Sequence, residues 1–171
     1  MPGSRSQGQL ARQHETDPRN KRHARGTDAA SSGYLGGICV KGQSYLFDTH
    51  ALIFWHQQEN VSEEFNAFFD EQSQQGQLFV SSVSFWEIGL LAQKDRITIS
   101  DVNNWAKEIL TLSGIRLAEP SVTEMIDSTL LPPHHKDPFD RLLIAQAKQR
   151  DLIFVSRDSL IGNYDVSTYW L

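Results

Sequence analysis

Short apolar runs alternate with amphipathic segments along most of this chain. From Tyr45 onward, the apolar runs are rich in Val, Ile, Leu and Phe and are bounded by polar or turn residues, which is typical of buried strands. They predict strands over 45–47, 78–80, 115–117, 152–155 and 166–170. The segments between them predict helices over 49–56, 62–74, 82–94, 100–112, 122–130 and 138–150.

Turn and breaker residues support these boundaries. Gly76 and Gly114 each follow a predicted helix, and Pro132 stops another. Short strands separated by helices predict an α/β fold, a three-layer sandwich with a short, mainly parallel central sheet flanked by helices. In such sheets, ligands bind at the carboxyl ends of the strands.

The first 43 residues differ from the rest. Residues 1–43 are rich in Arg, Gln, Ser, Gly and His and lack periodic apolar positions, so we expect a disordered, basic N-terminal extension before a domain over 44–171. The extension either contacts RNA as a basic arm, has no role, or reflects a start codon chosen too far upstream. A shorter product would need an alternative start, because no other Met precedes Met125.

Charge is distributed unevenly over the chain, whose net charge is −5. Residues 1–44 hold seven Lys and Arg against three Asp and Glu, whereas residues 45–171 hold nine against eighteen. An acidic domain is a poor general binder of nucleic acid and a good host for divalent cations. The single cysteine, Cys39, excludes an internal disulfide framework, and we find no signal peptide or membrane-spanning run, so we expect a cytoplasmic protein.

Four acidic residues stand where such a fold places its ligand site. Asp48 ends the first predicted strand, and Asp158 follows the fourth. Glu87 lies in the first turns of the helix after the second strand, and Asp140 lies in the first turn of the last helix. A carboxylate at the end of a buried strand is costly unless something compensates it, so these positions call for an explanation.

Each of the four acids also has a purely structural explanation. The two that follow strands could be N-caps of the next helices. Ser84 and Glu87 match a capping box, in which the glutamate bonds back to the serine. Asp137 suits the N-cap of the last helix and would leave Asp140 in its favourable first turn.

Taken together, the four acids indicate a metal site. Their carboxylates would repel one another strongly at one sheet edge unless a cation lay among them. Oxygen ligands suit Mg²⁺ or Mn²⁺, and no Cys or His cluster has zinc spacing, since His134 and His135 are adjacent. On the residues alone, metal-dependent phosphate chemistry and helix capping are both open.

Four stretches of this sequence resemble those of a known family. They are LFDTHALIFW, SSVSFWEI, DPFDRLLIAQA and VSRD. In this order and at these separations they resemble the PIN domain family, and within it the VapC-type toxins of bacterial toxin–antitoxin pairs. The resemblance covers the chain from Tyr45 to Leu171.

The resemblance implies a PIN-like sandwich and an Mg²⁺- or Mn²⁺-dependent endoribonuclease that leaves 5′-phosphate and 3′-hydroxyl ends. It implies that Asp48, Glu87, Asp140 and Asp158 hold the metal and carry catalysis. It also implies an RNA substrate (tRNA, rRNA or mRNA), a small antitoxin protein as partner, and a homodimer. Ser156 stands where many members carry Thr, and it keeps the hydroxyl.

Two other functions are alternatives. A haloacid dehalogenase-type phosphatase would need a second acid two residues after Asp48, where this chain has His50. A catalytically inactive PIN-like module that binds RNA or protein would be marked by missing acids, and all four are present.

Side chains near the acids have two interpretations each. Thr49 could contact substrate or cap a helix. Arg141 and Arg157 could hold RNA phosphate, although Arg141 is also spaced for a helical ion pair with Asp137. Trp86 could stack on a base or pack in the interior.

Overall fold

The computed structural model describes residues 42–171, and residues 1–41 of the predicted extension lie outside the described part. The predicted strands are present as β1 (Tyr45–Phe47), β2 (Leu78–Ser81), β3 (Arg116–Ala118), β4 (Ile153–Val155) and β5 (Thr168–Tyr169). The predicted helices are present as α1 (Thr49–Gln57), α2 (Glu63–Gln74), α3 (Ser82–Gln93), α4 (Val102–Leu112), α5 (Val122–Leu130) and α6 (Pro138–Gln149). A short 3₁₀ helix, η1 (Ser159–Asn163), has no counterpart in the sequence prediction. No helix within residues 42–171 is long and apolar enough to cross a bilayer.

The strands form one parallel sheet in the order β3-β2-β1-β4-β5. β1 is central, and Phe47 lies between Val80 of β2 and Val155 of β4. The chain continues from β1 to β2 on one side, whereas β4 pairs with β1 on the other. The carboxyl end of β1 is therefore a topological switch point, where folds of this kind bind ligands.

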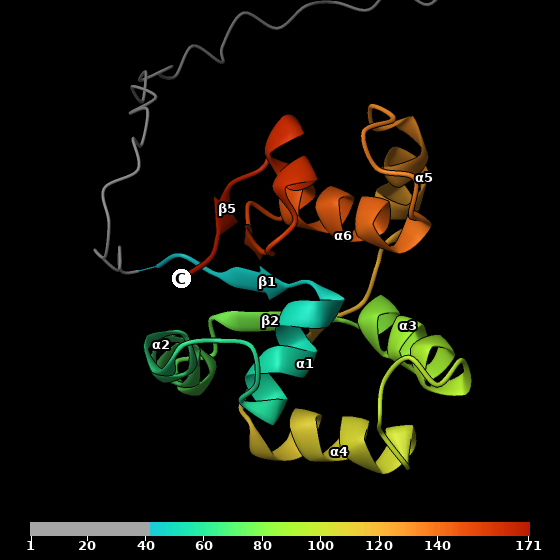
Figure 1. The fold of residues 1–171 in the computed structure, drawn as a ribbon. Helices are drawn as coiled ribbons and strands as arrows, with labels where there is room; N and C mark the ends of the chain where they lie inside the picture. Colours follow the sequence, from blue (N-terminus) through green and yellow to red (C-terminus); the bar gives the residue numbers. More distant parts are fainter. Residues whose placement is uncertain (1–41) are drawn as a thin grey trace, which may run out of the picture. The chain divides into compact units, whose positions relative to one another are not determined.

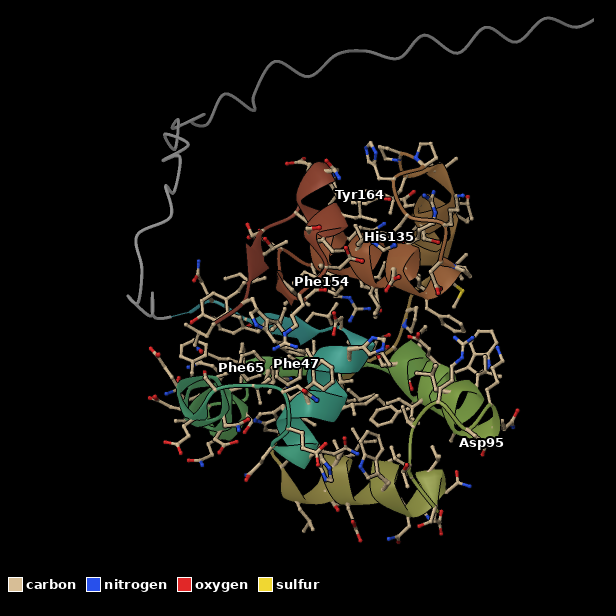
Figure 2. All side chains as sticks on the ribbon, in the orientation of Figure 1. Phe47, Phe65, Asp95, His135, Phe154 and Tyr164 are labelled. Atoms are coloured by element: carbon tan, nitrogen blue, oxygen red, sulfur yellow. The ribbon has the colours of Figure 1, made fainter. Side chains whose placement is uncertain are left out.

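Helices cover both faces of the sheet, as predicted (Figure 1). On one face, helices α1 to α4 enclose an aromatic core centred on Phe47, Phe65 and Phe69, all fully buried. On the other face, α6 and the segment around η1 pack against Leu46 and Phe154. Figure 2 shows Phe47 and Phe65 on one side of the sheet and Phe154 on the other. Successive residues of a strand point to opposite faces, so β1 contributes to both cores.

Candidate functional site

Asp48 lies directly after β1, at the switch point of the sheet. Its backbone NH donates to the carbonyl of Val155 at 3.1 Å, which anchors it to β4. Its Oδ1 accepts a hydrogen bond from the backbone NH of Ala51 at 2.5 Å, so the predicted N-cap is confirmed. Asp48 is only 9% exposed, and burial raises the pKa of its carboxyl, although a hydrogen bond with Ser156 lowers it. The hydrogen bond of the N-cap therefore does not fully offset the unfavourable burial of the charged Asp48 carboxylate.

Glu87 lies in the second turn of α3 and does not cap that helix. The predicted capping box of Ser84 and Glu87 is wrong, because α3 already begins at Ser82. Glu87 Oε2 instead accepts a hydrogen bond from Thr49 Oγ1 at 2.6 Å, which joins α3 to the start of α1. Burial raises the pKa of Glu87, and the negative charge of Asp48 raises it further.

Asp140 occupies the first turn of α6, behind the N-cap Asp137, as predicted. Burial raises the pKa of Asp140 from 3.8 to about 6. The neighbouring His135 lowers this pKa, whereas the charges of Asp137, Glu87 and Asp48 raise it. Asp140 therefore lies close enough to the acids at the end of β1 and in α3 for their charges to affect its pKa.

Asp158 approaches the same edge from β4. It is the N-cap of η1, and its Oδ1 accepts a hydrogen bond from the backbone NH of Leu160 at 2.8 Å. Its own backbone NH donates to Ser156 Oγ at 3.1 Å. The negative charge of Asp158 raises the pKa of Asp48. Asp158 therefore combines the predicted capping with an electrostatic effect on a second acid.

The structure brings all four predicted site residues to one edge of the sheet. Asp48 and Asp158 follow neighbouring strands, and Glu87 and Asp140 come from helices α3 and α6, which contact each other. Within residues 42–171, however, no three or more His, Cys, Asp or Glu side chains form a group that could hold a metal ion. The assignment of these four acids as metal ligands and catalytic residues stays a prediction.

His135 belongs to this edge, and the sequence interpretation missed it. Its side chain is 9% exposed, with Nδ1 3.2 Å from Asp140 Oδ2 and Nε2 3.0 Å from Asp158 Oδ2. In the sequence, the adjacent residues His134 and His135 lack zinc spacing. No other feature marks them as part of a site, apart from the position of His135 two residues before the helix cap Asp137.

The two arginines that could have held RNA phosphate have structural partners. Arg157 lies over the rings of Phe54 and Trp170 and donates to the carbonyl of Asn60. The predicted ion pair between Arg141 and Asp137 is not formed. Arg141 instead donates to the carbonyl oxygens of Thr129, Leu131, Pro132 and His135. Arg141 thereby holds the loop that leads into α6.

Trp86 is an exposed aromatic residue beside the acids. It is 65% exposed, and it precedes Glu87 in α3. Its ring packs edge to face with that of Phe139, with 5.0 Å between centroids, and Phe139 in turn precedes Asp140. An exposed indole in this place is suited to stack on a nucleotide base.

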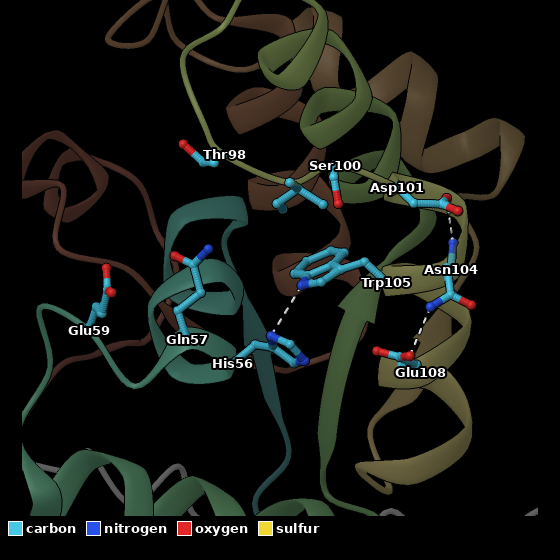
Figure 3. Close-up of a pocket in the computed structure, with 10 residues that line it drawn as sticks. His56, Gln57, Glu59, Thr98, Ser100, Asp101, Asn104, Trp105 and Glu108 are labelled. Carbon is cyan, nitrogen blue, oxygen red and sulfur yellow. Dashed lines mark hydrogen bonds between the residues drawn. The ribbon is translucent and has the colours of Figure 1, made fainter.

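A separate pocket lies between the end of α1 and the start of α4 (Figure 3). It has a volume of about 460 Å³, and none of the four acids lines it. At its wall, Trp105 Nε1 donates to His56 Nδ1 at 3.1 Å, so these two polar groups satisfy each other. Burial lowers the pKa of His56, which favours the neutral imidazole that this bond requires. The pocket is distinct from the acidic edge.

Comparison with known families identifies the chain. The model of the PIN domain family matches residues 45–166, so the chain belongs to this family. The resemblance to the PIN domain family is thereby confirmed. No curated protein matches the chain in sequence.

Solved structures share the fold at low sequence identity. FitAB bound to the IR36 DNA fragment has 17% identity and a TM-score of 0.54, and the match covers 73% of this chain and 93% of that one. DNA-bound VapBC from Salmonella typhimurium has 13% identity and a TM-score of 0.55, and the match covers 74% and 97%. FitAcB from Neisseria gonorrhoeae has 20% identity and a TM-score of 0.50, with coverage of 74% and 96%. These structures support the fold of the described domain.

Proposed function

We propose that this PIN domain is a metal-dependent endoribonuclease, and that Asp48, Glu87, Asp140 and Asp158 hold Mg²⁺ or Mn²⁺. The observation that carries the proposal is the placement of four acids from β1, α3, α6 and the segment after β4 at the switch point of the sheet. Burial and neighbouring negative charges raise the pKa values of three of these acids. Acids with perturbed pKa values in such a place are candidates for catalysis.

The chemistry of the four donor groups suits the proposed cation. All four side chains offer carboxylate oxygens, which are the ligands that Mg²⁺ and Mn²⁺ prefer. A bound cation would relieve the repulsion among them, generate a nucleophilic water and neutralise charge on the scissile phosphate. Because water rather than the ribose 2′-hydroxyl attacks, the products carry 5′-phosphate and 3′-hydroxyl ends.

Neighbouring groups orient these carboxylates before any ligand arrives. Thr49 holds one oxygen of Glu87, and the backbone NH of Ala51 holds one oxygen of Asp48. The carboxylates of Glu87 and Asp48 therefore have fixed directions, which reduces the reorganisation that ligand binding requires. Trp86 lies at the border of the site, where it would contact a base of the RNA.

We also propose that the protein is the toxin of a toxin–antitoxin pair and forms a homodimer. The sequence resemblance to VapC-type toxins and the shared fold with VapBC support this role. α5 supports a protein contact, because apolar side chains at helical spacing are exposed along it. They are Val122, Met125, Ile126 and Leu130, at 72%, 48%, 54% and 74% exposure. Light scattering should report a dimer for the full chain and a monomer for Leu130→Glu.

Incubation of the full chain with total bacterial RNA, with and without Mn²⁺, tests the nuclease proposal. Ligation of adapters to the fragments reports the chemistry of their ends. We expect cuts that require Mn²⁺ and leave 5′-phosphates. Cuts that persist in chelator and leave 5′-hydroxyls would contradict the proposal. RNA binding without any cutting would favour the inactive binding module.

A further inference from the structure

His135 forms a bridge between two acids that come from different parts of the chain. Its Nδ1 lies 3.2 Å from Asp140 Oδ2 in the first turn of α6, and its Nε2 lies 3.0 Å from Asp158 Oδ2 after β4. Nε2 is fully buried, and its geometry toward the carboxylate is not that of a hydrogen bond. The imidazole therefore lies between the two carboxylates, with one ring nitrogen toward each.

The backbone of His135 is held in place from the same two elements. Its NH donates to Tyr164 Oη at 2.7 Å, and that hydroxyl also donates to the carbonyl of Pro132 at 3.0 Å. Its carbonyl accepts from Arg141 at 3.3 Å. Tyr164 directly follows η1, which Asp158 caps, and Arg141 directly follows Asp140. Figure 2 shows His135 and Tyr164 close together on the α6 side of the sheet.

We propose that His135 is a positioning residue that sets the separation and orientation of Asp140 and Asp158 for the divalent cation. The proposal rests on the proposed metal-dependent function. His135 acts through the two carboxylates and does not itself contact RNA or the reacting atoms.

The chemistry of imidazole explains why one residue can do this. A neutral imidazole has one NH donor and one acceptor nitrogen, and it can donate to only one carboxylate at a time. The ring is rigid, so its two nitrogens face the two carboxylates at a fixed spacing, and an imidazole that carries a proton on each nitrogen can donate to both. Partners that orient metal-binding side chains in this way typically contribute tenfold to a hundredfold to metal affinity or activity.

Direct measurement of Mn²⁺ affinity tests the proposal. The electron paramagnetic resonance signal of free Mn²⁺ reports binding to the full chain without reference to activity. We expect His135→Ala to weaken Mn²⁺ binding by tenfold or more. His135→Gln keeps an NH donor and should lose less. The matched control is His134→Ala, because this adjacent imidazole is exposed and contacts the ring of Tyr164 rather than the two acids.

Kinetics on RNA separate positioning from a general loss of structure. His135→Gln should lower kcat in Mn²⁺ at saturating RNA and leave the KM for RNA unchanged. Mn²⁺ affinity equal to wild type in both His135 variants would overturn the proposal. Tighter Mn²⁺ binding in His135→Ala would also overturn it, because the ring would then compete with the cation. If wild type binds no Mn²⁺, the proposed function itself fails, and that result is distinct from an effect of His135.

Discussion

Two buried carboxylates in this domain have opposite electrostatic environments. Glu124 of α5 is 2% exposed and lies 2.6 Å from Arg150 Nε at the end of α6. Its hydrogen bonds with Arg150 hold the pKa of Glu124 below its ordinary value. Asp48 is 9% exposed, and burial raises the pKa of its carboxyl.

The difference lies in the groups that surround each acid. Glu124 has a guanidinium beside it and completes a capping box with Ser121, so its charge is fully compensated within the fold. Asp48 is influenced by Asp158 and contributes to the raised pKa values of Glu87 and Asp140. A buried acid that has a cationic partner is structural, whereas acids that raise each other's pKa values are suited to bind a cation from solution.

Substitution of Asp48 should reduce RNA cleavage more than any other change, whereas substitution of Glu124 should not reduce it. Asp48→Asn should lower RNA cleavage in Mn²⁺ on the order of 10³-fold, since loss of a metal's charge stabilisation amounts to several kcal/mol. Asn is also a good N-cap, so the start of α1 should survive the change. Asp137→Asn is the matched control, because it alters another N-cap aspartate of this edge that is not among the proposed ligands. Comparable losses in both variants would argue for capping rather than catalysis.

Glu124→Gln should lower the stability of the fold and leave RNA cleavage unchanged. It leaves Arg150 without its ionic partner, and breaking a fully buried pair costs about 3–5 kcal/mol of unfolding free energy. Arg150 is 33% exposed, so solvent screening reduces the expected loss to about 2 kcal/mol. Urea denaturation measures this loss, and the specific activity of the folded variant should equal that of wild type. A Glu124→Gln protein that is as stable as wild type but inactive would contradict the structural role of Glu124.

Trp86 is expected to contribute to RNA binding at the acidic edge. Trp86→Ala should raise the KM for RNA at least fivefold with little change in kcat, because stacking of one base contributes about 1–3 kcal/mol. Leu112→Ala removes an exposed apolar side chain from the end of α4, which has no proposed role in the site or the dimer, and should leave KM unchanged. Steady-state cleavage of a short RNA measures both. Equal values of KM in wild type and Trp86→Ala would place the RNA elsewhere.

In the metal-free protein, the contributions of Asp140 and Glu124 to thermal stability should change with pH in opposite directions. Each change should shift Tm by a few degrees. Asp140 has a raised pKa, so its contribution is fully present below 3.8 and is lost as pH rises through about 6. Glu124 has a lowered pKa, so its contribution is present above 4.5 and is lost as pH falls. In chelator, Asp140→Asn should remove part of a decrease in Tm between pH 5 and 7. Glu124→Gln should leave that decrease intact.

The fold and the sheet edge at which the four acids lie could be predicted because their signals are local. Each strand is a short apolar run. Asp48 directly follows β1, and Asp158 lies three residues after the end of β4. The N-cap roles of these aspartates follow from the same local pattern, and the structure confirms them.

The remaining features of the site depend on contacts between distant segments. Glu87 matched a capping box in sequence, but its partner is Thr49, which is 38 residues away. His135 meets Asp158 only because the loop before α6 packs against the segment after β4. Arg141 was spaced for a helical ion pair, yet the preceding loop offers it several carbonyl oxygens. Local spacing cannot distinguish these outcomes, since each depends on how α3, α6 and η1 pack on the sheet.

Calorimetric titration of the full chain with Mn²⁺ tests the central claim most directly. The account predicts saturable binding by wild type, binding at least tenfold weaker in Asp48→Asn, and unchanged binding in Glu124→Gln. The thermal stability of wild type should rise with Mn²⁺ by mass action, and that of Asp48→Asn should rise less. Equal Mn²⁺ affinity in wild type and Asp48→Asn, or no binding by either, would contradict the claim that the acids at the end of β1 form a metal site.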